Sequence, residues 1–280
     1  MIRKACVADL PTLVRLYDTC FPGEAEFRAW FFTHVTSPEH ILLEEEDGVL
    51  RAATHALPCA LEQNGARFGA SYIYAAATEP RFRRRGLMRR LLERTFTEAR
   101  EKGMDFSVLI TENDGVFPFY FELGYLPSFC VSRESVAAEQ NSTLSVRRAQ
   151  AADIPAMLAL YAAGTEGLLR VARDEAFYRL RLLQYGAQAY VACDARGDVS
   201  AYAFADIQPE QLWIAEAFGT PAKALCAAIA AAEGKRAAVV NTAAQRAQVP
   251  MGCLLPLTAR GAEAARITDR RAAYLNLMWN

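Results

Sequence analysis

A run of arginines around a single glycine is the part of the sequence most able to do chemistry. Residues 80–90 read PRFRRRGLMRR, with six arginines around Gly86. An apolar, strand-like stretch precedes the run and a stretch of helical periodicity follows it, so we expect it at a strand-to-helix junction. A helix N-terminus offers unpaired N–H groups and a positive dipole end, a glycine permits close approach of the backbone, and arginines add charge-assisted hydrogen bonds. The pattern favours a phosphate site. A solvated face and a nucleic-acid patch are the alternatives.

Side chains able to accept a proton occur on two neighbouring predicted strands. Glu44, Glu45 and Glu46 follow an apolar triplet, and strand alternation sends Glu45 to the face opposite the other two. These carboxylates either hold a cationic group or form a solvated face. His55, on the next strand, either titrates near neutral pH or is a structural residue of an apolar stretch.

Composition excludes several classes of protein. The chain has 280 residues, of which 52% are hydrophobic and 22% charged, so it folds rather than remaining disordered. A net charge of −1 argues against a nucleic-acid binder. The seven cysteines form no CxxC pair, which fits buried thiols in a reducing compartment and predicts neither disulfides nor a metal site. Because no leader and no apolar run of membrane-spanning length is present, we expect a cytoplasmic protein without a membrane partner.

The first half of the chain has the pattern of a mixed α/β domain. Two strands are expected within residues 40–57, joined by a hairpin turn at Asp47-Gly48, and a further strand over 68–78. Residues 86–103 have one apolar helical face and end at Gly103. Residues 105–111 read as a strand buried on both faces, and 114–124 as a second helix.

An internal repeat indicates two domains. Residues 2–17 align without gaps with residues 146–161, and the matches include an arginine, an aspartate and a proline in each copy. We read each aspartate as a helix N-cap and each proline as a first-turn residue. Any amphipathic helix with such a start would look similar, but the match also covers the preceding strand. The predicted domains are 1–135 and 146–280, with the polar stretch 136–145 as the linker.

Two motifs in this order resemble the GCN5-related N-acetyltransferase (GNAT) superfamily. Its R/Q-x-x-G-x-G/A signature corresponds to residues 83–88, and a later segment matches at Asn113, Val116, Phe119-Tyr120 and Gly124-Tyr125. Met88 and Val116 depart from the small residues that the family has there. The duplication is similar to the enhanced-intracellular-survival type of acetyltransferase, without its sterol-carrier-like third domain. This resemblance implies two tandem GNAT-like domains, each with a mixed, mostly antiparallel, twisted sheet flanked by helices.

The resemblance implies acetyl-CoA as the co-substrate and assigns residues to it. The pyrophosphate would lie on the backbone of the loop, and the pantetheine arm would pair with the main chain of a strand. The implied cofactor-binding residues are Ala76, Ala77, Thr78, Arg83, Arg84, Arg85, Gly86, Leu87, Met88, Arg89 and Asn113. Tyr120 would donate a proton to the departing thiolate, although it also fits as a core aromatic.

The general base stays open between several groups. The glutamates 44–46 and His55 are candidates from the residues themselves, and water is the default. In the related three-domain enzymes the C-terminal carboxylate serves, here that of Asn280. Residues 273–280 look like a strand of the second domain, so we expect this carboxylate not to reach the site.

The second half lacks the phosphate pattern. Its corresponding junction reads Phe218-Gly219-Thr220-Pro221-Ala222-Lys223, and Pro221 removes a backbone donor, so we expect no CoA site there. The predicted function is acetyl-CoA-dependent N-acetyl transfer to a primary amine of a small molecule or protein, and a homo-oligomer is compatible with it. The alternative is a catalytically idle member that binds acyl-CoA or a protein partner.

Overall fold

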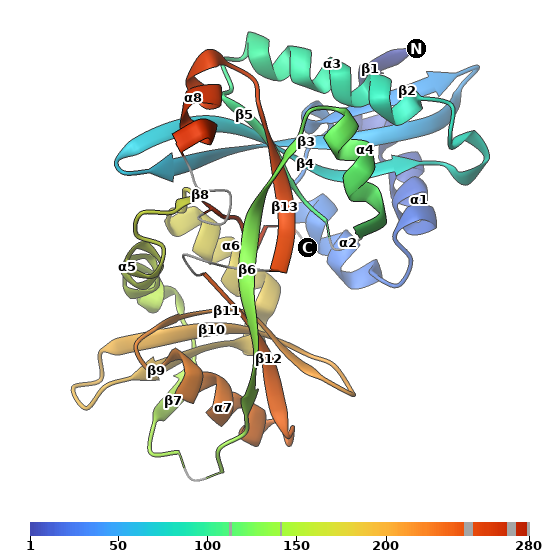
Figure 1. The fold of residues 1–280 in the computed structure, drawn as a ribbon. Coiled ribbons are helices and arrows are strands. Elements are labelled where there is room, and N and C mark those ends of the chain that lie inside the picture. Colours follow the sequence, from blue (N-terminus) through green and yellow to red (C-terminus); the bar gives the residue numbers. More distant parts are fainter. Residues whose placement is uncertain (112–113, 141, 244–248, 268–272, 279–280) are drawn as a thin grey trace.

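The computed structural model describes the chain except for residues 112–113, 141, 244–248, 268–272 and 279–280. Figure 1 shows two halves, each with a twisted sheet and flanking helices, connected by the long strands β6 and β13. Neighbouring strands pair mostly antiparallel, with parallel pairs at β4–β5 and β11–β12. The predicted mixed α/β class is confirmed.

The elements of the two halves follow in chain order. The first half contains β1 (Ile2–Lys4), α1 (Leu10–Cys20), α2 (Ala25–His34), β2 (Ile41–Glu46), β3 (Val49–Gln63), β4 (Ala66–Thr78), α3 (Leu87–Glu101), β5 (Phe106–Ile110), α4 (Phe117–Glu122) and β6 (Leu126–Ala137). The second contains β7 (Ser145–Arg148), α5 (Ile154–Gly164), β8 (Leu169–Val171), α6 (Glu175–Tyr185), β9 (Ala189–Cys193), β10 (Val199–Ile207), β11 (Leu212–Gly219), α7 (Ala222–Ala232), β12 (Ala237–Thr242), β13 (Val249–Pro256), α8 (Ala259–Ile267) and β14 (Ala273–Tyr274).

Local sequence signals account for the turns and helix ends near the site. Asp47 and Gly48 both have positive φ, 51° and 74°, as the predicted two-residue hairpin requires. A second turn of the same kind, at Asn64-Gly65, joins β3 to β4 and escaped the sequence analysis. Helix α3 buries the predicted apolar face and ends before Gly103, which has φ 71°. These signals fix the long β3–β4 hairpin and the direction of α3.

The repeat seen in the sequence is a repeat of the same ion pair. The two terminal guanidinium nitrogens of Arg3 donate hydrogen bonds to the Asp9 carboxylate, at 2.7 and 2.8 Å. Those of Arg147 donate in the same way to Asp153, both at 2.7 Å. Each aspartate also accepts the backbone N–H three residues before it, at 2.8 Å. The aspartates were predicted to cap the following helices. They stabilise the preceding turn instead, because their oxygens are taken by groups upstream.

The two halves exchange strands, which differs from the expected division at residues 136–145. Strand β13, from the C-terminal part of the chain, pairs with β5 and β6 and so lies inside the first sheet. The last part of β6, residues 132–137, pairs with β12 and completes the second sheet. Part of the predicted linker is therefore strand, and residues 249–256 belong to the first sheet rather than to a separate second unit.

Helices cover the two faces of the first sheet unequally. Helices α3 and α4 pack on one face, around Leu92, Phe96 and Phe117. Helix α1 packs on the other face, against residues of β2, β3 and β4. Helix α2 lies on this second face too, where Phe31 joins the core shared by both halves.

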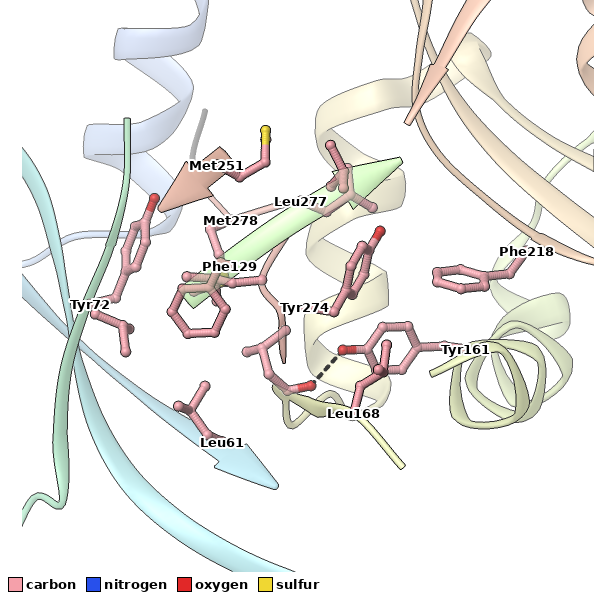
Figure 2. Packing of buried hydrophobic residues seen from close by; sticks show 14 of the residues in the cluster. Leu61, Tyr72, Phe129, Tyr161, Leu168, Phe218, Met251, Tyr274, Leu277 and Met278 are labelled. Atoms are coloured by element: carbon pink, nitrogen blue, oxygen red, sulfur yellow. Dashed lines mark hydrogen bonds between the residues drawn. The ribbon is translucent and has the colours of Figure 1, made fainter. Parts of the chain in front are cut away.

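The C-terminal segment fills the space between the halves. Residues 273–278 are buried, and Figure 2 shows Met278 near Tyr72, Phe129 and Met251. Arg181 donates to the Met278 carbonyl at 2.8 Å, and Arg173 to that of Asn276 at 3.0 Å. Among the described residues 273–278, Ala273–Tyr274 form a strand, β14, which pairs with β6 and β8. The predicted strand of the second domain is thus a short strand followed by a buried segment between the halves.

Strand exchange leads to a prediction about fragments. We expect a chain ending at Ala138 to lack a cooperative urea transition, since β5 and β6 lose the strand that joins them. The same fragment with residues 249–256 fused through a flexible linker should regain cooperative unfolding. Far-ultraviolet circular dichroism against urea concentration measures both. A cooperative transition of the short fragment at the midpoint of the whole chain would contradict the prediction.

Candidate active site

Strands β4 and β5 run together for three residues and then part. Ala70, Ser71 and Tyr72 pair with residues 106–108, whereas β4 continues to Thr78. A bulge follows, because β4 places Ala75 and Ala76 opposite the single residue Thr54 of β3. Ala75 has φ 44°, a left-handed conformation that is strained for a residue with a side chain. The parted strands leave the β4 main chain facing a gap, where an extended ligand can pair with it.

The loop after β4 has the geometry of an anion site. Gly86 is the N-cap of α3 with φ 73°, and Arg84 has φ 62°. The Arg90 N–H donates to the carbonyl of Gly86, one turn earlier, at 3.2 Å. The N–H groups that precede it at the helix start have no such partner within the helix and point out of its N-terminal end. A Cβ on Gly86 would meet only the Arg90 guanidinium, at 3.6 Å. The backbone angle therefore requires glycine, and the space above it is open.

The arginines divide into paired and unpaired groups. Arg81, Arg89 and Arg90 form ion pairs with Glu79, Glu122 and Glu44, at 2.9, 2.7 and 2.8 Å. Arg83 donates to the Thr78 carbonyl at 3.1 Å, and Arg85 donates to the Arg81 carbonyl at 3.2 Å. Within the described part of the chain, no carboxylate pairs with residues 83–85. Their charge remains available to an anion at this loop.

Tyr120 lies beside the gap on helix α4. Its ring packs edge-on against Tyr125 at 5.6 Å and shares an apolar cluster with Ala76, Met88 and Cys253. Burial raises the pKa of Tyr120 to about 12, so the phenol keeps its proton at neutral pH. The structure thus brings the predicted donor near the bulged strand and the start of α3.

The remaining predicted cofactor-binding residues differ in where the structure places them. Ala76 and Met88 face the Tyr120 cluster, whereas Ala77 faces α1 on the other side of the sheet. Leu87 is buried, so only its main chain can reach a ligand. Asn113 lies outside the described residues. The structure therefore brings together the strand, the loop and Tyr120, and leaves Asn113 without a structural position.

The three glutamates named from the sequence as candidate bases form ion pairs with arginines. Glu44 is 4% exposed and pairs with both Arg51 and Arg90, at 3.0 and 2.8 Å. Glu45, on the opposite face as predicted, pairs with Arg3 at 2.8 Å, and Glu46 with Arg51.

His55 is also unsuited to the role of base. It is 3% exposed among the rings of Phe31, Phe32 and Tyr74, and burial lowers its pKa to about 3. Asn280 lies outside the described residues. The glutamates and His55 are structural groups in this arrangement.

The sequence analysis missed a hydrogen-bonded chain on the α1 side of the gap. Tyr17 donates to Glu24 at 2.8 Å, and the hydroxyls of Tyr17 and Tyr74 lie 2.9 Å apart. Tyr74 directly precedes the strained Ala75. The three residues are far apart in the sequence and share no motif, and Tyr17 read only as an apolar helix position. A polar-tipped tyrosine on a buried face, in need of a partner, was the available signal.

The second half has the same framework without the anion loop. Strands β11 and β12 pair over residues 212–214 and then part. A cavity of about 590 Å³ lies at this point, lined by α5, β11, the start of α7 and β12. Pro221 is the N-cap of α7, and Lys223 pairs with Glu134 at 2.8 Å. The loop thus lacks both the glycine-opened helix start and the unpaired cations of the first half.

Within the described ranges the structure has neither a membrane-spanning helix nor a metal-binding cluster. No helix there is long and apolar enough to cross a bilayer. Among the same residues, no three potential metal ligands lie close enough to hold an ion.

Comparisons with known proteins point to one family. Residues 1–127 match the model of the acetyltransferase (GNAT) domain. A GCN5-related N-acetyltransferase from Kribbella flavida superposes with a TM-score of 0.72 at 21% identity, over 95% of this chain and 73% of that one. Eis1 from Mycobacterium abscessus gives 0.63 at 14% identity, over 94% and 75%.

A more distant likeness extends to a eukaryotic enzyme. Saccharomyces cerevisiae N-myristoyltransferase, solved with bound myristoyl-CoA, gives a TM-score of 0.62 at 10% identity, over 91% of this chain and 78% of that one. None of the curated protein sequences is significantly similar to the chain. Residues 1–127 therefore resemble a GNAT acetyltransferase domain, in a chain whose two halves together have the fold of GCN5-related N-acetyltransferases.

Proposed function

We propose that the protein transfers the acetyl group of acetyl-CoA to a primary amine of a small molecule or protein. One observation carries the proposal: the bulged, parted strand β4 leads into the glycine-opened start of α3, and Tyr120 lies in the same cluster as Ala76 and Met88. The parted strand fits the pantetheine arm, and the loop fits the pyrophosphate. The residues present thus fit acetyl-CoA.

The main chain would supply most of the binding. N–H groups at the start of α3 and the cations of residues 83–85 would hold the pyrophosphate, and the main chain of Ala76–Thr78 would pair with the pantetheine amides. A backbone N–H at the bulge would stabilise the negative charge that develops on the thioester oxygen. The strained Ala75 supports this assignment, because a fixed bulge presets the direction of the donor.

Tyr120 would complete the reaction. As the carbon–sulfur bond breaks, the phenol donates its proton to the thiolate, and it recovers a proton from the nitrogen that has formed the amide. Burial keeps this phenol protonated until that moment. The alternative, an idle protein that binds acyl-CoA, is favoured by no feature of the site.

The experiment that tests the function measures thiol release from acyl-CoA. Acetyl-CoA is offered with a panel of polyamines, aminoglycosides, amino acids and peptides. A parallel series with longer acyl chains is needed, because a structural neighbour was solved with myristoyl-CoA. Amine-dependent release that is fastest with acetyl-CoA supports the proposal. Binding of acetyl-CoA without release from any amine supports the idle alternative.

Replacing Tyr120 by phenylalanine removes only the hydroxyl. We expect turnover to fall by roughly ten- to ten-thousandfold, the range for one general acid, with little change in acetyl-CoA affinity. Steady-state kinetics and calorimetric titration measure the two quantities. Unchanged turnover would show that Tyr120 serves packing alone.

Gly86→Glu should abolish tight acetyl-CoA binding, because the new carboxylate would lie beside the phosphates. The positive φ of Gly86 also strains any side chain, so the control must carry the same strain. Gly103, at the other end of α3, has φ 71° against 73° and open surroundings, and Gly103→Glu should bind normally.

Gly219 of the second half is unsuitable as this control, since a Cβ there would lie 2.2 Å from the Ser200 carbonyl oxygen. Calorimetric titration of acetyl-CoA into both variants decides the matter. Tight binding by the Gly86 variant would assign the basic loop to another ligand.

A further inference from the structure

The hydroxyls of Tyr17 and Tyr74 form a directed chain that ends at a carboxylate. The carboxylate of Glu24 accepts the Tyr17 proton at 2.8 Å. The Tyr17 oxygen therefore accepts from Tyr74, 2.9 Å away, and Tyr74 acts as the donor of that bond. This arrangement leaves the lone pairs of the Tyr74 oxygen to accept a further proton. The chain thus has one open accepting end.

The open end lies at the candidate active site and the other end at the surface. Tyr74 directly precedes the bulge of β4, and its side chain projects to the α1 side of the sheet, opposite α3 and α4. Tyr17 is 3% exposed, and Glu24 is exposed at the N-cap of α2. The chain thus leads from the β4 residue before the bulge to the surface through the buried Tyr17 hydroxyl.

The residues around Tyr17 and Tyr74 keep both phenols protonated. Burial raises the pKa of both phenols, so neither ionises at working pH. The charged neighbours are Arg28 of α2 and Asp18 of α1, which pair with each other, and His55 of β3 is neutral beside Tyr74. Glu24 is thus the carboxylate at which the hydrogen-bonded chain ends.

We propose that Tyr74, Tyr17 and Glu24 form a proton relay that deprotonates the acceptor ammonium. The proposal rests on the proposed function. It replaces bulk water as the first proton acceptor. Tyr74 contacts the acceptor, and Tyr17 and Glu24 act through it.

The proton balance is complete without a further reactant. The ammonium gives one proton to the Tyr74 oxygen while Tyr74 passes its own to Tyr17 and Tyr17 passes its own to Glu24, which releases it to solvent. The neutral amine then forms the carbon–nitrogen bond, the carbon–sulfur bond breaks, and the second nitrogen proton reaches the thiolate by way of Tyr120. The products are the amide, the CoA thiol and one released proton.

Two small nucleophiles separate the relay from the rest of the reaction. Ethylamine is an ammonium ion at pH 7.5, whereas hydroxylamine is neutral there and needs no deprotonation before attack. For Tyr74→Phe we expect kcat/KM with ethylamine and acetyl-CoA to fall by about 10²- to 10⁴-fold, the range for a general base, and that with hydroxylamine to change little. Glu24→Gln, which keeps an accepting oxygen but cannot take the proton, should behave in the same way.

The pH profile gives a second readout. The wild type should use the ammonium form, so its kcat/KM with ethylamine should change little with pH between neutrality and the amine pKa. Both variants depend on the free amine, so their kcat/KM should rise about tenfold per pH unit toward the amine pKa, about 10.4 for an alkylamine. Loss of packing would lower the rate without changing this slope.

The matched control is the tyrosine at the equivalent repeat position. Tyr161 corresponds to Tyr17, and its hydroxyl donates to the Val171 carbonyl at 2.7 Å in the second half. Figure 2 shows this bond as a dashed line from the Tyr161 hydroxyl. Tyr161→Phe should leave the ratio of ethylamine to hydroxylamine rates unchanged.

Continuity of the relay is tested without acetyl-CoA. In protein labelled with ¹³C at the tyrosine ζ carbon, Glu24→Gln should shift the Tyr74 signal, and Tyr17→Phe should abolish that effect of the Glu24 substitution. A Tyr74 signal that ignores Glu24 would overturn the relay. Equal ethylamine rates in wild type and Tyr74→Phe would overturn it too, with the proposed function intact. Catalysis of neither nucleophile by the wild type would overturn both.

Discussion

The insertion of β13 between β5 and β6 is the constraint on which the other features depend. The β5 strand has β4 on one side for only three residues, and β13 pairs with its other side over five, Phe106–Ile110. This second neighbour lets β4 leave β5 without loss of the sheet. Gly252 belongs to the same contact, since a Cβ there would lie 2.0 Å from the Leu109 carbonyl oxygen. The gap of the candidate site is therefore held open from the far side of β5.

The two halves share one backbone arrangement but differ in the charges at its strand-to-helix junction. In each, a strand parts from its parallel neighbour and a helix begins beside the gap. The first half leaves arginine charge unpaired at that point, whereas the second pairs Lys223 with Glu134 and places a proline at the helix start. The second half instead buries a charge pair, Arg173 with Glu216 at 2.6 Å, which Tyr202 and Tyr274 complete. This polar network also holds the C-terminal segment, because Arg173 donates to the Asn276 carbonyl.

Sequence reasoning recovered what short segments determine. The Gly86 loop was predictable because a glycine, a basic run and a helical period lie within a few residues, and the Asp47-Gly48 turn for a similar reason. The predicted capping role of Asp9 was wrong, because a local sequence pattern does not determine which neighbouring N–H group its carboxylate accepts. The position of β13 could not be predicted, because an apolar strand pattern is compatible with any free sheet edge. The Tyr17–Tyr74 contact could not be predicted either, because two hydroxyls 57 residues apart in the sequence form no recognisable motif.

Strand exchange also sets the order in which the protein can fold during synthesis. Residues 1–138 leave the ribosome long before residues 249–256, so the edge of β5 stays without its partner while the second half is made. At about 5–20 residues per second this interval is on the order of ten seconds, far longer than hairpins and helices need to form. An exposed apolar strand edge over that time is a site for chaperone binding or for misassembly with another nascent chain. The geometry that holds the gap of the candidate site open thus makes the first half depend on the synthesis of residues 249–256.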